Sequence, residues 1–323
     1  MLSKYLDPKN DVAFKKIFGS EKNQDILIHF INDILGFKGT KAIKEVIFLS
    51  PVQDPKIAIQ KQSIVDVLCK DSNGVQYIIE MQVAETGGFE KRAQYYAAKA
   101  YSGQLNKGQG EDGLYKNLKE IIFIAIANFT LFPEKSGYKS DHIILDKDNH
   151  DHDLKDFYFT FIELPKFTKK TVDELENMEE KWCYFFKYAS ATKPEDFKKM
   201  IEGNLVIQKA YEVLEQYNWS EQELMAYEQE TKRVWDNRAV EDFKIEKARL
   251  QLVEAEKKGM ERGREEGREE GIVEGMKKGK EEGMEEGERN KAIKMAKLML
   301  SKNRPISEII EFTGLSESEI KNL

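Results

Sequence analysis

Two short apolar runs separated by a turn constrain the fold of this chain more than any other stretch. Residues 64–69 and 78–83 are rich in β-branched side chains and flank an Asp-Ser-Asn-Gly segment, a pattern that predicts a β-hairpin. Polar side chains interrupt both runs where a buried strand is normally apolar. These positions are Asp66 in the first run and Glu80 and Gln82 in the second.

The register of this hairpin decides whether the polar side chains meet. A two-residue loop would put Asp66 and Glu80 on opposite faces, because side chains alternate along a strand. A three-residue loop at 72–74 places Asp66 opposite Glu80. Gly74 then takes the third loop position, where the left-handed backbone favours glycine. We therefore expect the three-residue loop, with Asp66, Glu80 and Gln82 on one face.

Two interpretations of Asp66 and Glu80 follow from this register. Neighbouring carboxylates repel each other unless a cation lies between them, and hard oxygen ligands suit Mg²⁺ or Mn²⁺. The alternative is a pair of exposed carboxylates on an amphipathic hairpin. Spacing alone leaves both interpretations open.

Composition places the chain among soluble proteins and limits its partners. The 323 residues are 40% hydrophobic and 34% charged, enough for about two domains. The net charge of −7 excludes a global basic field, so DNA binding would need a local basic patch or a metal ion.

The same sequence gives an expectation for the compartment. No apolar run reaches the roughly 20 residues of a membrane span, and the N-terminus lacks the apolar core of a signal peptide. Cys69 and Cys183 lie in unrelated contexts and predict no disulfide framework. We expect a cytoplasmic protein without a membrane partner.

Helical and strand patterns interleave across residues 1–168 and predict one α/β domain. Asn10 or Asp11 would cap a first helix that ends at Gly19, and the local pattern favours a capping role for Asp11. The further elements we expect are a second helix ending at Gly36, strands at 42–49, 120–128 and 157–164, and a helix at 89–104.

The helix expected at 89–104 carries a second set of candidate residues. Arg92, Tyr95, Tyr96 and Lys99 lie three or four positions apart and so share one side. Beside the hairpin, Arg92 and Lys99 would reach a phosphate near the carboxylates. The alternative is a solvated helix face with aromatic packing.

Beyond the α/β domain we expect three helical segments. Residues 169–238 predict a helical extension, and 291–323 a small module with helix-turn-helix spacing. Between them, 239–290 is a charged segment in which glycine recurs at every fourth position from Gly259 to Gly287. A linker-like helix and a self-associating helix both fit this repeat. The last helix of the module is acidic, which favours protein interaction over DNA binding.

Several of these segments together resemble a known family. They are residues 7–19 (DPKNDVAFKKIFG), the Asp66 and Glu80-Met81-Gln82 hairpin, and residues 92–96 (RAQYY). The combination resembles the PD-(D/E)XK nuclease superfamily, and within it the Rpn branch of recombination-promoting nucleases and transposases. The charged glycine repeat and the small C-terminal module are also similar to members of this branch.

The resemblance implies a restriction-endonuclease-like core, a mixed sheet flanked by helices, and a Mg²⁺- or Mn²⁺-dependent DNA endonuclease. Carried over to this sequence, Asp66 and Glu80 would bind the metal, with the Met81 carbonyl as a third ligand. Gln82 stands where the superfamily usually has a catalytic lysine. It cannot act as a base, but it can orient a water molecule.

Supporting roles follow from the same resemblance. Asp11 would add a contact to a metal-bound water, and Arg92 or Lys99 would offset phosphate charge. The implied setting is DNA recombination, mobile elements or phage defence.

An alternative function is a catalytically weak nuclease-fold protein that self-associates as a homo-oligomer through its C-terminal region. A related hypothesis concerns an internal translation start at Met276 or Met284. Codons for Glu-Glu-Gly are purine-rich, and a purine-rich tract ahead of an in-frame Met can act as a ribosome-binding site. The resulting C-terminal fragment would bind the full-length chain.

Overall fold

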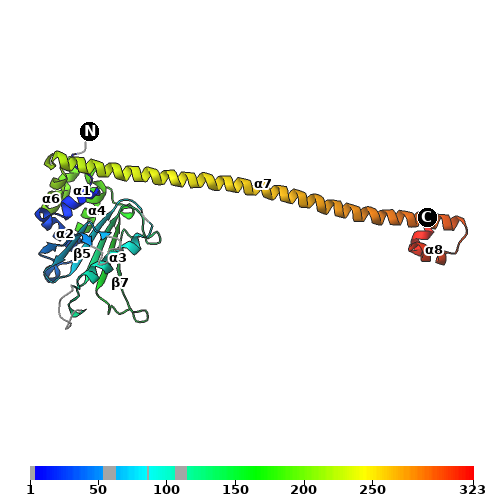
Figure 1. The fold of residues 1–323 in the computed structure, drawn as a ribbon, viewed down its shortest axis with the longest axis horizontal. Coiled ribbons are helices and arrows are strands. Elements are labelled where there is room, and N and C mark those ends of the chain that lie inside the picture. Colours follow the sequence, from blue (N-terminus) through cyan, green and yellow to red (C-terminus); the bar gives the residue numbers. More distant parts are fainter. Residues whose placement is uncertain (1–3, 54–62, 86, 106–114) are drawn as a thin grey trace. The chain divides into compact units, whose positions relative to one another are not determined.

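A six-stranded mixed sheet is the centre of the N-terminal unit (Figure 1). The computed structural model describes residues 4–53, 63–85, 87–105 and 115–323. Neighbouring strands pair antiparallel except for β5–β6 and β6–β8, which are parallel. In spatial order the strands are β1 (Val46–Phe48), β4 (Val67–Asp71), β5 (Gln76–Gln82), β6 (Ile121–Ala127), β8 (Phe157–Glu163) and β7 (Lys139–Ile143). The expected mixed sheet with flanking helices is confirmed.

The predicted three-residue hairpin loop is confirmed. Val67 pairs with Ile79 and Lys70 with Gln76, a register that continues to Asp66 opposite Glu80. The Asp71 N–H donates to the Val75 carbonyl and closes the loop. Gly74 has φ +85°, the left-handed conformation that the prediction assigned to it.

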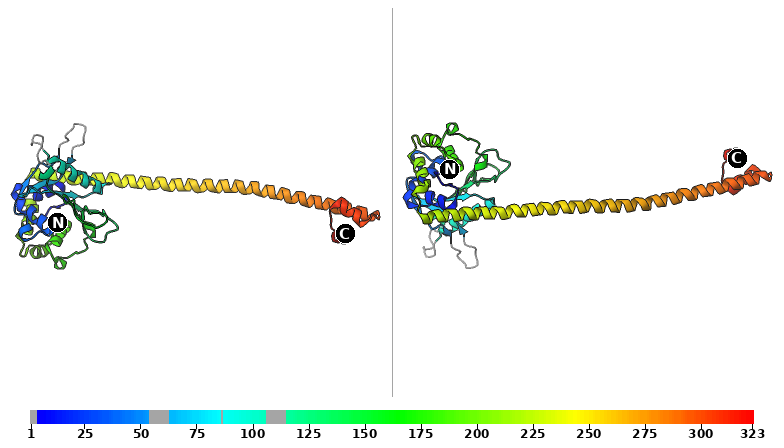
Figure 2. Two further views of the ribbon diagram at one scale, coloured as in Figure 1. Left: turned by 90° about the horizontal axis from the view of Figure 1, so that it is seen from below. Right: turned by 90° about the horizontal axis from the view of Figure 1, so that it is seen from above.

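Each face of the sheet carries its own apolar cluster. Helix α3 (Phe89–Gly103) covers one face, where its alanines pack against side chains such as Ile78 and Phe123. On the other face, α1 (Asp11–Phe18) and α2 (Gln24–Leu35) pack against α4 (Met178–Tyr188) and α6 (Leu205–Leu214) (Figures 1 and 2). Strand β6 is buried along its whole length, as its continuous apolar run predicts.

Two strands differ from expectation for identifiable reasons. The strand expected at 42–49 is confined to β1, because Ile43 bonds through both backbone groups to the Asn32 side chain of α2. The polar strand β7 lies at the edge of the sheet, pairs only with β8, and carries no apolar run that would have predicted it. A further short pair, β2 (Val52–Gln53) and β3 (Ser63–Ile64), forms a separate two-stranded sheet.

The region after the sheet is helical. It contains α4, α5 (Pro194–Ile201), α6 and the start of α7 (Glu221–Ser301). The expected capping box opens α7, with Ser220 and Glu223 bonded to each other's backbone N–H groups. Helix α7 then continues without a break to Ser301, so the helix expected to begin at 291 is its last part.

The chain forms two compact units, residues 1–240 and 241–323. The second unit contains the rest of α7, α8 (Ile306–Thr313) and α9 (Glu317–Lys321), with a small core of Ala296, Ile309, Leu315 and Ile320. Within the described parts of the chain, no helix has the length and apolar character needed to cross a membrane.

Candidate active site

The hairpin carboxylates meet where the pairing of β4 with β5 ends. The last pair is Val67 with Ile79, and within the described residues no strand pairs with the following part of β5 on that side. The Asp66 carboxylate takes that place and accepts the Met81 N–H at 2.8 Å. The Asp66 N–H in turn faces Glu80 Oε1 at 3.3 Å. Asp66 therefore completes the strand edge with its side chain and lies next to Glu80.

A bend at Asp66 changes the direction that its side chain takes. Val65 packs in the same cluster as Leu68, although regular alternation would place them on opposite faces. Asp66 consequently reaches Lys15 of α1, whereas Gln82 reaches Arg92 of α3. The strict alternation that predicted one shared face for all three polar residues ends at this bend.

Helix α1 brings Asp11 and Lys15 to the carboxylates. Asn10 caps the helix by accepting the Val12 N–H, so the expected capping role of Asp11 is wrong. Asp11 instead pairs with Lys15 at 2.8 Å, and Lys15 Nζ lies 3.8 Å from Asp66 Oδ1. This ammonium group partly offsets the negative charge of the cluster.

The surroundings of this cluster favour the protonated forms of its carboxylates. Burial raises the pKa of Asp66 to about 6, and nearby Asp11 adds to the effect against the Met81 hydrogen bond. Burial and the Asp66 carboxylate raise the pKa of Glu80 well above its ordinary value. Burial alone would lower the pKa of Lys15, but its pairing with Asp11 and the nearby Asp66 and Glu80 carboxylates raise it. The cluster holds more buried negative charge than its cations neutralise.

Gln82 and Arg92 form a second layer beside the carboxylates. The Gln82 amide accepts a hydrogen bond from Arg92 and donates one to the Ala84 carbonyl at 2.8 Å. The Arg92 guanidinium lies over the Phe89 ring, 4.9 Å from its centre. Arg92 thereby fixes the orientation of the Gln82 side chain.

Lys99 and Tyr96 lie further along α3. The Lys99 ammonium is 5.9 Å from the centre of the Tyr95 ring, and Lys99 is not among the residues that line the pocket described below. Burial raises the pKa of Tyr96, and the Glu80 and Asp66 carboxylates add to this shift against Arg92. Tyr96 therefore faces the carboxylates, as its position four residues after Arg92 indicates.

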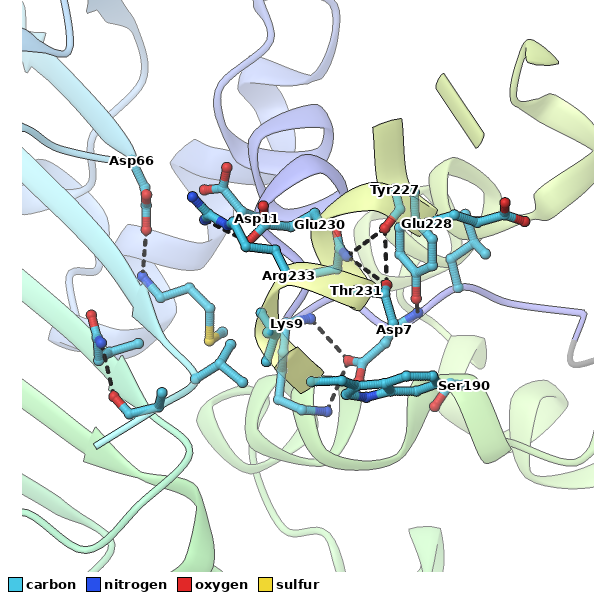
Figure 3. A pocket seen from close by; sticks show the side chains of 18 of the residues that line it. Asp7, Lys9, Asp11, Asp66, Ser190, Tyr227, Glu228, Glu230, Thr231 and Arg233 are labelled. Atoms are coloured by element: carbon cyan, nitrogen blue, oxygen red, sulfur yellow. Dashed lines mark hydrogen bonds and ion pairs between the residues drawn. The ribbon is translucent and has the colours of Figure 1, made fainter. Parts of the chain in front are cut away.

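A pocket of about 740 Å³ opens in front of the carboxylates (Figure 3). Asp11, Asp66, Glu80 and the backbone after Glu80 line one part of it. The first turns of α7 line the other part, including Tyr227, Glu230, Thr231, Arg233 and Trp235.

Hydrogen bonds attach this part of α7 to the N-terminal segment. The Asp7 N–H donates to the Tyr227 hydroxyl, and the Asn10 amide donates to Thr231 Oγ1. Lys16 of α1 pairs with Glu223 at 2.6 Å. The first turns of α7 are therefore a structural wall of the pocket.

Sequence reasoning did not identify Lys15 or the α7 residues as part of the site. Lys15 had a signal, since it lies four positions after Asp11 on one helix. Arg233 had none, because it comes to the pocket from more than half the chain away and its local pattern is that of an ordinary charged helix.

The family follows from comparison with known proteins. The sequence pattern of the PD-(D/E)XK nuclease family transposase matches residues 8–243. The chain belongs to this family. Neither the curated proteins nor the solved structures give a match.

Membership of the PD-(D/E)XK nuclease family transposases indicates a nuclease- or transposase-like function. The matched range includes the sheet, its helices and the pocket wall formed by α7. The cluster of Asp11, Asp66 and Glu80 therefore lies within the family domain.

The donor set fits a hard divalent cation of the kind that such nucleases typically use. Asp66 and Glu80 supply carboxylate oxygens. The Met81 carbonyl points to the same side of β5 as its N–H, which bonds Asp66. Among the residues that the structure describes, no three His, Cys, Asp or Glu side chains gather closely enough to hold a metal. Mg²⁺ commonly uses one or two carboxylates and keeps several waters, so two carboxylates and a carbonyl suffice.

Proposed function

We propose that this protein is a Mg²⁺- or Mn²⁺-dependent DNA endonuclease that hydrolyses phosphodiester bonds. One observation carries the proposal most directly: the buried carboxylate of Glu80 and the half-buried carboxylate of Asp66 face one pocket, and both have raised pKa values. A divalent cation would relieve their repulsion. The membership of the PD-(D/E)XK nuclease family supports DNA as the substrate.

Each residue of the site would have its own role in this reaction. Asp66, Glu80 and the Met81 carbonyl would hold the cation, which when bound activates a water molecule and offsets phosphate charge. The Met81 N–H keeps the Asp66 carboxylate in place. Lys15 holds Asp11 beside Asp66, where Asp11 can accept a hydrogen bond from an incoming water.

Gln82 would position the attacking water without acting as a base. Its amide oxygen has two acceptor positions and its amide nitrogen two donor positions. Arg92 and the Ala84 carbonyl each use one of them. The remaining donor and acceptor can orient a water molecule, while Arg92 prevents the amide from rotating.

Plasmid nicking tests this proposal. Purified protein is expected to convert supercoiled DNA to nicked circles with Mg²⁺ or Mn²⁺ and to lose this activity with EDTA. Asp66→Ala should be inactive although it still folds, as a cooperative thermal melt would show. Cleavage that survives both Asp66→Ala and Glu80→Ala would disprove the assignment of the site.

The proposed biological setting is DNA recombination, mobile-element activity or phage defence in the cytoplasm. The family description names both nuclease and transposase, and the second word supports the mobile-element role. Recombination assays in cells that carry the wild-type or the Asp66→Ala gene would separate these roles from unrelated DNA damage.

A second candidate function is self-association through the glycine repeat of α7. A Cβ atom added at each glycine from Gly259 to Gly287 would meet no atom within 4 Å in the described chain. Contacts within this chain therefore do not require glycine, whereas close approach of a second helix would. Sedimentation of the full chain should show an oligomer that Gly267→Ala, Gly271→Ala and Gly275→Ala together weaken. An oligomer unchanged by these substitutions would contradict this role for the glycines.

A further inference from the structure

We propose that helix α7 holds an unpaired nucleotide of the DNA substrate: Arg233 binds the phosphate beside the carboxylates and Trp235 stacks on the adjacent base. The inference rests on the proposed nuclease function and adds a substrate preference to it. Arg233 and Trp235 both line the 740 Å³ pocket that contains Asp66 and Glu80.

Arg233 is the basic side chain best placed to contact a phosphate. Of the described residues that line the pocket, Lys9 and Arg233 are the basic ones. The Lys9 side chain is 13% exposed and bonds Asp7 and the Phe186 carbonyl. The Arg233 side chain is 68% exposed. A guanidinium group has five N–H donors, and Glu230 takes a single one of them at 2.7 Å.

The position of Arg233 also suits the scissile phosphate. Figure 3 shows its side chain beside Asp11 and Glu230 at the edge of the pocket. The ion pair with Glu230 holds the guanidinium in place, and Asp11 lies close enough to contribute to its raised pKa. A phosphate bound near Asp11, Asp66 and Glu80 would therefore meet Arg233 directly.

Arg92 and Lys15, the other cations near the carboxylates, are engaged differently. Arg92 bonds the Gln82 amide and lies over the Phe89 ring. Lys15 pairs with Asp11 at 2.8 Å and lies 3.8 Å from Asp66. Both of these side chains organise the carboxylate cluster, and the phosphate-binding role goes to Arg233.

Trp235 supplies an aromatic surface on the other side of α7. Two residues along a helix turn the side-chain direction by about 200°, so Arg233 and Trp235 flank the part of α7 that faces the pocket. The Trp235 side chain is 69% exposed. Among the described residues, it makes no ring contact and no hydrogen bond. By contrast, the Tyr227 hydroxyl bonds the Asp7 N–H and its ring packs on Trp219.

A phosphate site and an exposed indole that line one pocket from either side of α7 fit a single nucleotide. A base inside a duplex already stacks on its neighbours, so it must leave the stack before an indole can replace them. Stacking on an aromatic side chain tolerates every base, because every base has a π face. The expected substrate is DNA with unpaired nucleotides at the cleavage position, such as a single strand, a flap or a gap.

Binding measurements separate the two roles. Fluorescence anisotropy with labelled single-stranded, gapped and blunt duplex DNA would use the full-length Asp66→Asn protein, so that the DNA stays intact. Single-stranded and gapped DNA should bind more tightly than the duplex. Arg233→Gln should weaken binding to all three and lower the slope of log affinity against log salt by about one, whereas Arg233→Lys should retain that slope.

Trp235→Ala should weaken binding to single-stranded and gapped DNA on the order of tenfold. The salt slope and the affinity for duplex DNA should stay unchanged. Matched controls are Lys232→Gln for loss of charge and Phe243→Ala for loss of an exposed aromatic ring. Neither control residue lines the pocket, and Phe243 is 70% exposed on the same helix.

Each outcome is decisive. A lower salt slope in Arg233→Gln supports the phosphate-binding role, and loss of the single-strand preference in Trp235→Ala supports the stacking role. If the wild-type protein cleaves DNA, and both variants bind all three DNAs as tightly as the Asp66→Asn protein does, this inference is overturned and the proposed function stands. If the wild-type protein neither binds nor cleaves any of these DNAs, the proposed function itself fails and the inference fails with it.

Discussion

Two strands of the same sheet each carry a buried carboxylate at or near their last residue, and the surroundings of the two carboxylates differ. Glu163, the last residue of β8, is fully buried and accepts the Leu131 and Phe132 N–H groups at 2.6 and 3.0 Å. Lys166 pairs with its other oxygen at 2.8 Å. Glu80, near the end of β5, is also buried but faces a second carboxylate, Asp66.

This difference distinguishes a structural acid from the acid that we propose to be functional. The hydrogen bonds and ion pair of Glu163 compensate for its burial, so it attaches the loop after β6 to the sheet. The Asp66–Glu80 pair has raised pKa values because its neighbours do not compensate for the buried charge. A buried acid with incomplete partners at the edge of a pocket is a candidate ligand for a cation.

The largest expected effect is a loss of catalysis when the Asp66–Glu80 pair is changed. Glu80→Gln should lower the rate of Mg²⁺-dependent cleavage by more than about 100-fold, because it removes a charged metal ligand while preserving shape. The metal-free variant should be at least as stable as the wild type, since it loses a repulsive buried charge. Cleavage time courses beside thermal melts measure both. A Glu80→Gln protein with wild-type activity would place the metal elsewhere.

The opposite result, a loss of stability without a loss of activity, is expected at Glu163. Glu163→Ala should cost about 3 kcal/mol of unfolding free energy, because it removes the buried carboxylate that pairs with Lys166 and accepts the Leu131 and Phe132 N–H groups. Urea denaturation measures this loss. Cleavage per folded molecule should stay close to that of the wild type, and a selective loss of activity would make Glu163 part of the active site.

An intermediate effect is expected at Arg92, which orients Gln82. Arg92→Gln should slow cleavage about tenfold, the usual range for a group that positions an active-site residue. The salt dependence of DNA binding should stay unchanged, because this guanidinium bonds the Gln82 amide and is not among the described residues that line the pocket. A reduced salt slope would instead return Arg92 to the phosphate-binding role that the sequence predicted.

The smallest effect concerns pH and the metal-free protein. The folded-state pKa of Asp66, about 6, lies above its ordinary value, so its contribution to stability is greatest when it is protonated. Metal-free protein should therefore lose on the order of 1 kcal/mol of stability as the pH rises from about 4 to about 6. Melting curves of wild type and Asp66→Asn across this range provide the comparison. Equal pH dependence in both proteins would contradict the raised pKa.

The hairpin was predictable from sequence because its information is local. Gly74 fixed the loop length, and the loop length fixed Asp66 opposite Glu80. The bend that turns Asp66 toward Lys15 was not predictable, since it depends on where β4 stops pairing. The wall formed by α7 was also missed, because long-range packing rather than local pattern brings Tyr227 and Arg233 to the pocket.

The central claim is that Asp66 and Glu80 together bind a divalent cation. Calorimetric titration of metal-free protein with Mn²⁺, repeated on Asp66→Asn, Glu80→Gln and Glu163→Gln, tests it without reference to cleavage. Wild type and Glu163→Gln should bind Mn²⁺ alike, while Asp66→Asn and Glu80→Gln should each lose most of the affinity. Equal Mn²⁺ binding by all four proteins, or no binding by the wild type at neutral pH, would contradict this claim.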